Sequence, residues 1–216
     1  MHVAWGILAL LGLALVEGGI VAIFDPDLDS LAAKLSAQAM LAVTLVVVAF
    51  AFAAQPGPGL AEPRALGLRP FRPASLKWVL AAFGIYIAFA AAYSTLVHPD
   101  QEDVARELGF EESLFGAIAS GVLIIGLAPV SEEIFFRGFV YGGLRRTLTV
   151  WPAVIISGAI FGPFHFTGVD SVGVVPQLAV FGAILAWLYE KTGSLWPPIL
   201  LHGVNNTLAF IVITAG

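Results

Sequence analysis

The chain has 216 residues, of which 59% are apolar and only 12% are charged, and its mean hydropathy is +0.92. Soluble globular domains are about 45–50% apolar and about 25% charged, so this composition indicates an integral membrane protein. The lack of cysteine excludes disulfides, a thiol nucleophile and a cysteine-ligated metal. The net charge of −5 does not bear on a nucleic-acid partner, because most of the acidic residues lie in two loops, but the basic patch with interleaved aromatic residues that a nucleic-acid binder needs is missing.

Seven apolar segments follow one another, each close to the roughly 20 residues that a helix needs to cross a bilayer. They run over residues 3–24, 37–54, 78–97, 114–130, 151–167, 172–189 and 195–214. The first lacks the basic start of a signal peptide and is too long for one, so we interpret it as a span. The fourth continues to about residue 145, and Pro129 is expected to kink or split it. We predict an all-α polytopic membrane bundle of seven helices, or eight if this segment breaks.

Charged residues alternate between the predicted loops. The second, fourth and sixth loops are basic, with Arg64, Arg69, Arg72, Lys77, Arg145, Arg146 and Lys191. The first, third and fifth are acidic, with Asp25, Asp27, Asp29, Asp100, Glu102, Asp103, Glu107, Glu111, Glu112 and Asp170. Because Lys and Arg mark the cytoplasmic side, we expect a cytoplasmic N-terminus and a C-terminus outside.

The second loop is also rich in proline, with Pro56, Pro58, Pro63, Pro70 and Pro73, and is the nearest feature to a linker. It is expected to separate the first two helices from the rest. We divide the chain into three N-terminal helices, residues 1–112, and a C-terminal core, residues 113–216, within one compact membrane domain. No internal repeat suggests an inverted-repeat transporter.

Ionisable side chains inside membrane spans are costly, so each one needs a reason. They are Glu17, Glu132, Glu133, Arg137, His165 and His202, with Asn205 and Asn206 beside the last. Counted from the cytoplasmic ends, Glu132 and His165 lie about 21 Å deep and His202 about 12 Å deep. Three separate segments thus place polar groups at compatible depths. Glu17 lies near the acidic end of its span and is interpreted as reaching the membrane interface.

Spacing assigns different tasks to the two adjacent glutamates. Glu133 and Arg137 are four residues apart, which favours an ion pair on one helix face. Glu132 projects about 100° away and is free to face a cavity.

The two histidine segments also show helical spacing. Phe161 precedes His165 by four residues, which places a ring one turn from the imidazole. His202 and Asn206, also four apart, share a face.

Two hydrolytic mechanisms fit these residues. In the first, Glu132 is the general base for a water, His165 positions that water or supplies protons, and His202 with Asn206 stabilises an oxyanion. In the second, Glu132, His165 and His202 hold a divalent metal, with zinc the best fit to two histidines and one carboxylate. Both alternatives remain open at this point.

Three motifs resemble those of the CPBP family of intramembrane metalloproteases, which includes type II CAAX prenyl endopeptidases and bacteriocin-processing, Abi-like proteins. The first is Glu132-Glu133-Ile-Phe-Phe-Arg137, the second Phe161-Gly-Pro-Phe-His165, and the third His202-Gly-Val-Asn-Asn206. The resemblance covers residues 113–216.

It implies a helical membrane core that opens toward the cytoplasm, with Glu132 as the base that activates water. His165, His202 and Asn206 match the other catalytic positions, and Glu133, Arg137 and Phe161 support them.

The expected function is therefore an intramembrane endopeptidase of a bacterial or archaeal plasma membrane. Its expected partners are membrane lipid, a peptide or membrane-protein substrate, and a second copy of the chain. The alternatives are a non-proteolytic binding or bacteriocin-immunity protein, and a proton-linked transporter.

Overall fold

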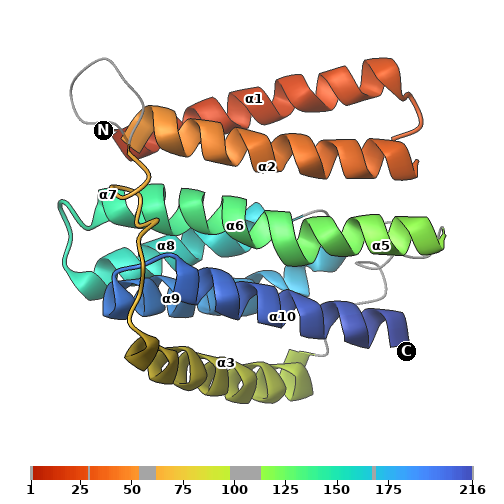
Figure 1. The fold of residues 1–216 in the computed structure, drawn as a ribbon. Coiled ribbons are helices and arrows are strands. Elements are labelled where there is room, and N and C mark those ends of the chain that lie inside the picture. The colour runs from red at the N-terminus through yellow and green to blue at the C-terminus, as the bar shows by residue number, and fades with distance from the viewer. Residues whose placement is uncertain (1, 29, 54–61, 98–112, 167–168, 216) are drawn as a thin grey trace.

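The computed structural model describes the whole chain except residues 1, 29, 54–61, 98–112, 167–168 and 216. Within those limits every regular element is a helix, which confirms the all-α prediction (Figure 1). The elements are α1 (His2–Phe24), α2 (Leu31–Ala53), η1 (Pro73–Ser75), α3 (Leu76–Val97), α5 (Leu114–Val122), η2 (Leu123–Leu127), α6 (Ala128–Glu133), η3 (Ile134–Tyr141), α7 (Gly142–Leu144), α8 (Val150–Phe164), η4 (Val169–Gly173), α9 (Val175–Thr192) and α10 (Trp196–Ala215).

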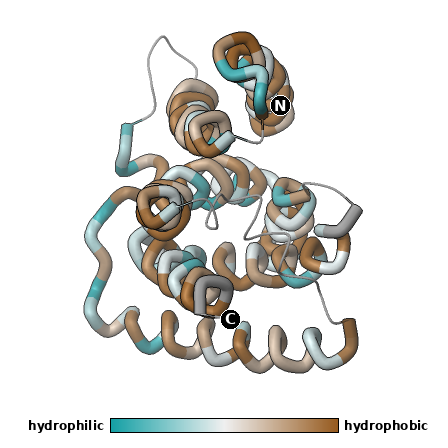
Figure 2. The backbone as a smooth tube through the Cα atoms, turned by 90° about the vertical axis from the view of Figure 1, so that its right-hand side faces the viewer, coloured by the Kyte–Doolittle hydropathy of each residue, from teal (hydrophilic) through white to brown (hydrophobic). Residues whose placement is uncertain are grey.

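Among the described residues, five helical stretches are long and apolar enough to cross a membrane. They are Val3–Phe24, Leu31–Ala53, Pro73–Val97, Leu114–Leu144 and Ser171–Thr192, while α8 is a shorter apolar helix. Apolar residues cover the outer faces of the bundle as well as its interior (Figure 2), and in α1 Leu15 and Phe24 are 79% and 85% exposed. An apolar outer surface suits lipid, so the chain is an integral membrane protein. The count of seven or eight spans stays a prediction.

The fourth predicted segment is one helical stretch and does not split at Pro129. It runs from Leu114 to Leu144, with π-helical turns at η2 and η3 on either side of α6. Pro129 lies in the first turn of α6, directly after η2. A π-helical turn can absorb the missing backbone donor of a proline, which allows the helix to continue.

This long stretch occupies the middle of the bundle (Figure 1). The hairpin of α1 and α2 covers one side of it, and α8, α9 and α10 cover the other, with α3 outermost against α9 and α10. Helices α8 and α9 approach closely at two glycines of α8. A β-carbon added at Gly158 or at Gly162 would lie less than 3 Å from an atom of Ala179 in α9, at 2.4 and 2.8 Å respectively. Small residues permit such packing between membrane helices.

The described part of the proline-rich loop, residues 62–72, is packed rather than a linker. Leu66 is fully buried and lies against Gly138, and the Leu195 amide donates to the Gly67 carbonyl at 2.9 Å. Gly67 has a φ of +90°, a conformation that favours glycine. For these residues the linker prediction is therefore wrong, since backbone pairing with the turn before α10 fixes them. Pro56, Pro58 and the acidic third loop lie outside the described residues.

Candidate active site

Three side chains from separate helices converge on one point inside the bundle. Glu132 belongs to α6, His165 caps the C-terminal end of α8, and His202 lies in the second turn of α10. His165 Nε2 is 3.4 Å from Glu132 Oε2, and His202 Nε2 is 3.9 Å from the same oxygen. This geometry agrees with the prediction from the sequence that the three residues lie at compatible depths.

Glu133 serves two partners with one oxygen. Arg137 Nη1 donates to Glu133 Oε1 at 2.7 Å, which confirms the predicted ion pair, and His202 Nδ1 lies 2.9 Å from the same atom. The Glu133 and Arg137 side chains are fully buried, whereas Glu132 is 12% and His165 27% exposed. Glu133 and Arg137 are thus sealed inside the bundle, while Glu132 and His165 border accessible space.

The hydrogen bonds at Nδ1 orient both imidazole rings. His202 Nδ1 faces the Glu133 carboxylate, and His165 Nδ1 faces the Phe161 carbonyl at 2.9 Å. Both partners can only accept, so each Nδ1 carries the proton and donates it. In the neutral rings both Nε2 atoms are then acceptors directed at Glu132 Oε2, a buried oxygen that forms no hydrogen bond within the described part of the chain. Three acceptor atoms that face one another can be bridged by a hydrogen-bond donor, such as a water molecule, or by a cation.

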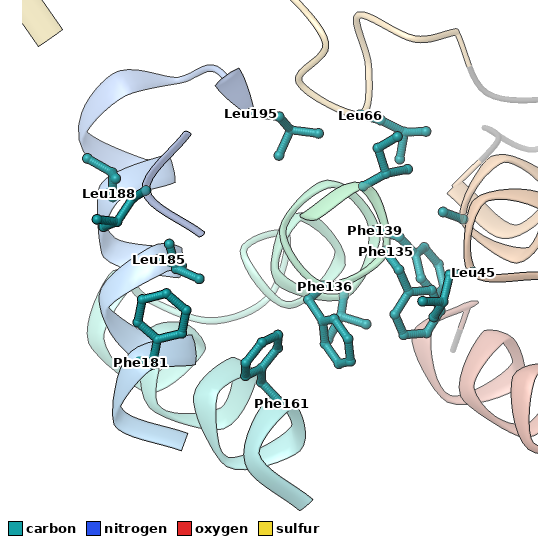
Figure 3. Close-up of a cluster of buried hydrophobic side chains, with 14 of the residues drawn as sticks. Leu45, Leu66, Phe135, Phe136, Phe139, Phe161, Phe181, Leu185, Leu188 and Leu195 are labelled. Atoms are coloured by element: carbon teal, nitrogen blue, oxygen red, sulfur yellow. The ribbon is translucent and has the colours of Figure 1, made fainter. Parts of the chain in front are cut away.

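Aromatic rings form the walls of the site. The Phe161 ring centroid lies 4.6 Å from that of His165 and 5.8 Å from that of His202, and the Arg137 guanidinium sits 4.4 Å above the Phe161 ring. Phe181 of α9 packs edge-on against His202 at 5.5 Å. Figure 3 shows Phe161 and Phe181 between the helices. Phe161 was predicted from spacing, but Phe181 was missed, because nothing in its local sequence separates it from a core residue.

A backbone contact to α9 completes the surroundings of Arg137. Its Nη2 donates to the Gly182 carbonyl at 3.0 Å, and a β-carbon at Gly182 would lie 2.7 Å from that of Phe161. Sequence analysis did not identify Gly182. Only its position opposite Phe161 distinguishes it from the chain's other glycines.

Two predicted polar residues point elsewhere. Asn206 donates from Nδ2 to the Ile124 carbonyl of η2 at 2.9 Å, and within the described residues it forms no hydrogen bond to Glu132 or either histidine. Glu17 of α1 accepts a hydrogen bond from Thr44 of α2. Asn206 therefore ties α10 to η2, and Glu17 ties α1 to α2.

The fit of a metal ion can be judged from the same atoms. Two imidazole Nε2 atoms and one carboxylate oxygen are a chemically suitable donor set. In the part of the chain that the structure describes, however, no group of three or more His, Asp or Glu side chains is spaced to hold a metal ion. We therefore derive no catalytic step through a metal, and the predicted zinc stays a prediction.

Comparison with known proteins identifies one matching family model and several relatives. Residues 114–208 match a family model described as "Rce1-like: Type II CAAX prenyl endopeptidase Rce1-like". The chain is 29% identical over 143 residues to "Putative membrane peptidase YdiL" of Bacillus subtilis (strain 168), covering 64% of this chain and 56% of that protein. It is 31% identical over 105 residues to "CAAX prenyl protease 2" of Homo sapiens, covering 41% of this chain and 32% of that protein.

A third relative is "Uncharacterized protein YyaK" of Bacillus subtilis (strain 168), 28% identical over 163 residues, with 68% of this chain and 53% of that protein covered. The chain spans about half the length of the two Bacillus relatives. No solved structure matches it. The matched region contains Glu132, Glu133, Arg137, Phe161, His165, His202 and Asn206, the residues on which the resemblance was based. Residues 114–208 are therefore similar to the Rce1-like type II CAAX prenyl endopeptidases.

Proposed function

We propose that the chain is an intramembrane endopeptidase in which Glu132 activates the water that cleaves a peptide bond. One observation carries the proposal: Glu132 Oε2 and the Nε2 atoms of His165 and His202 meet inside the bundle at 3.4 and 3.9 Å. They come from three helices that lie far apart in the sequence. A water between these acceptors can donate one hydrogen to the carboxylate and the other to an imidazole.

The hydrolytic steps follow from this placement. Glu132 removes a proton from the water while the water oxygen attacks the carbonyl carbon of the substrate. The carbon–nitrogen bond then breaks, and the proton passes from Glu132, directly or through His165, to the leaving amine. His165 suits this relay because it lies nearest to Glu132 and is the more exposed of the two histidines.

His202 is assigned to the oxyanion. Its Nδ1 donates to the Glu133 carboxylate, which directs Nε2 toward Glu132, and an Nε2 that takes up a proton during the reaction can donate it to the developing negative oxygen. Arg137 holds Glu133 in place from the opposite side. Asn206 keeps its second amide hydrogen free of the Ile124 bond and is assigned a supporting role beside His202.

The zinc alternative uses Glu132, His165 and His202 as ligands. Their Nδ1 partners, the Phe161 carbonyl and the Glu133 carboxylate, are of the kind that orient metal-binding imidazoles. A bound ion would act as a Lewis acid and lower the pKa of a water.

The substrate class is a peptide or a membrane protein that reaches the site within the bilayer. This agrees with the names of two relatives, "Putative membrane peptidase YdiL" and "CAAX prenyl protease 2". We place the protein in a bacterial or archaeal plasma membrane with the N-terminus in the cytoplasm, because the basic loops would then lie inside. Bacteriocin processing and self-association are further expectations.

The test is cleavage of a reporter peptide library by the purified full chain in detergent. Wild type is compared with Glu132→Ala, His165→Ala and His202→Ala, and with Glu62→Ala as a control, since Glu62 is exposed in the 62–72 segment. Each preparation is assayed before and after chelation, and after zinc is restored. Folding is checked by thermal unfolding.

We expect cleavage by wild type and Glu62→Ala and its loss in the other three variants. Loss after chelation with recovery in zinc would support the metal alternative, and unchanged cleavage would support glutamate alone. If wild type and all three site variants behave alike on every substrate, the endopeptidase is refuted and a non-proteolytic binding or immunity role takes its place.

A further inference from the structure

A cluster of two lysines and two tryptophans lies where α3 begins and α9 ends, away from the candidate active site. The Lys77 ammonium is 5.3 Å from the Trp78 ring centroid, and the Lys191 ammonium is 5.6 Å from the same ring. Trp187 packs edge-on against Trp78 at 5.8 Å and lies 5.9 Å from the Lys191 ammonium. Two cations from separate helices therefore converge on one indole ring.

The two ammonium groups of this cluster lack a close counterion among the described residues. Neither Lys77 nor Lys191 forms an ion pair within the described residues. The adjacent carboxylate, Glu190, already accepts from Tyr141 at 2.8 Å and from two nitrogens of Arg145 at 3.2 Å each. The ammonium groups are at most about 11 Å apart, the sum of their distances to the Trp78 centroid. An anion between them would relieve their mutual repulsion.

The cluster lies at the level of the membrane surface. All five tryptophans, Trp5, Trp78, Trp151, Trp187 and Trp196, belong to helix ends on the same side of the bundle, together with the basic loops (Figure 1). Tryptophan is enriched where lipid headgroups meet the hydrocarbon core. The anion that is abundant at this depth is a lipid phosphate.

Space and apolar surface are available next to the lysines. A cavity of about 370 Å³ is lined by Val150, Trp151, Trp187, Glu190 and Lys191. On α3, Leu76 and Leu80 are one turn apart and are 43% and 71% exposed, so they offer an apolar surface on one helix face. A headgroup on the lysines and a chain along α3 would use both features.

The geometry points to a binding site for an anionic phospholipid, with Lys77 and Lys191 contacting the phosphate and Trp78 and Trp187 forming its floor. Lysine is suited to this role because its ammonium is a compact charge on a flexible stem. The inference does not depend on the proposed peptidase activity, since its test measures lipid binding.

The experiment uses the purified full chain in nanodiscs of phosphatidylcholine with increasing phosphatidylglycerol that carries brominated acyl chains. Every protein in the comparison carries Phe in place of Trp5, Trp151 and Trp196, so emission comes from Trp78 and Trp187 alone. Bromine quenches tryptophan emission, and the midpoint of quenching then reports lipid at the cluster. The test variant is Lys77→Gln with Lys191→Gln. The matched control is Arg64→Gln with Arg146→Gln, which removes the same charge from exposed residues at the same end of the bundle.

We expect brominated phosphatidylglycerol to quench wild type more strongly than brominated phosphatidylcholine does. Each lysine contributes about a fivefold gain in lipid affinity, so the double lysine variant is expected to lose about thirtyfold. The arginine control, which removes the same surface charge away from the two tryptophans, is expected to lose clearly less than the lysine variant.

Three results would overturn the assignment. Equal shifts in the lysine and arginine variants would mean that only the general surface charge attracts lipid. Equal quenching by both lipids would remove the preference for an anionic headgroup. A change in tryptophan emission with inorganic phosphate in neutral nanodiscs, without any response to phosphatidylglycerol, would make the ligand a soluble anion.

Discussion

His202 Nδ1 lies 2.9 Å from Glu133 Oε1, so the second glutamate of the Glu132-Glu133 pair holds the imidazole of the third motif. The same oxygen accepts from Arg137 at 2.7 Å. One carboxylate thus connects the long central helix to α10 and neutralises a fully buried guanidinium. The two neighbouring glutamates have different surroundings: Glu133 binds Arg137 and His202 through Oε1 and is fully buried, while Glu132 is 12% exposed and faces the two histidines.

Replacing Glu133 is expected to destabilise the protein strongly. In Glu133→Gln the Arg137 charge loses its counterion inside the bundle, and stranding a buried charge costs about 3–5 kcal/mol. The free energy of unfolding in detergent, measured by denaturant titration, checks this.

The control for Glu133 is Glu190→Gln, because the Glu190 pair with Arg145 is about one third exposed. That change should cost at most about 1 kcal/mol. Comparable losses in the two variants would contradict the distinction between a buried and a surface pair.

Replacing Glu132 is expected to have the opposite effect on stability. Glu132→Gln introduces an amide that can donate to His165 Nε2, where the carboxylate oxygen has no hydrogen bond of its own. Stability should be unchanged or rise by up to about 1.5 kcal/mol, while cleavage falls by about a hundredfold or more. Unfolding and peptide cleavage are measured on the same preparation. A variant that is both inactive and clearly less stable would assign Glu132 to the fold rather than to the reaction.

Gly182 is expected to tolerate no side chain. In Gly182→Ala the new β-carbon would lie 2.7 Å from the Phe161 β-carbon, and overpacking of this kind costs about 1–3 kcal/mol. Phe161 would shift against both imidazoles, so the cleavage rate should fall as well. Thermal unfolding and cleavage kinetics check both effects.

Gly84→Ala in α3 is the matched control for Gly182→Ala. No atom lies within 4 Å of the position that its β-carbon would take. This change should be neutral or slightly stabilising, by up to about 1 kcal/mol, because alanine favours a helix. Equal behaviour of the two alanine variants would show that contact with Phe161 is unimportant.

The parts of the site that local spacing determines were predictable from the sequence. The Glu133–Arg137 pair and the ring of Phe161 beside His165 both follow from four-residue intervals within one helical segment. The meeting of Glu132, His165 and His202 followed from depth, because a membrane span converts residue number into position along one axis.

Contacts that depend on helix rotation and packing were not predictable. Depth alone does not say which glutamate faces His202, and the approach of Gly182 to Phe161 depends on how closely α8 and α9 pack. The proline-rich segment was taken for a linker from its composition. Its fixed position comes from a pairing of Gly67 with Leu195, more than 120 residues away, which composition does not encode.

The hydrogen bond between Thr44 and Glu17 gives the first helix pair a testable structural role. Glu17 lies in α1, which packs chiefly on α2, and in Thr44→Val it loses its only described donor. Leaving a buried or half-buried acceptor unpaired costs about 1–2 kcal/mol, so stability should fall by that amount. Cleavage per folded molecule should remain at the wild-type level, because neither residue contacts Glu132 or the histidines.

Thr95→Val is the control, since Thr95 is exposed and donates within its own helix to the Ala92 carbonyl. If Thr44→Val instead abolishes cleavage while the protein stays folded, Glu17 acts in the reaction and its assignment to the fold is wrong.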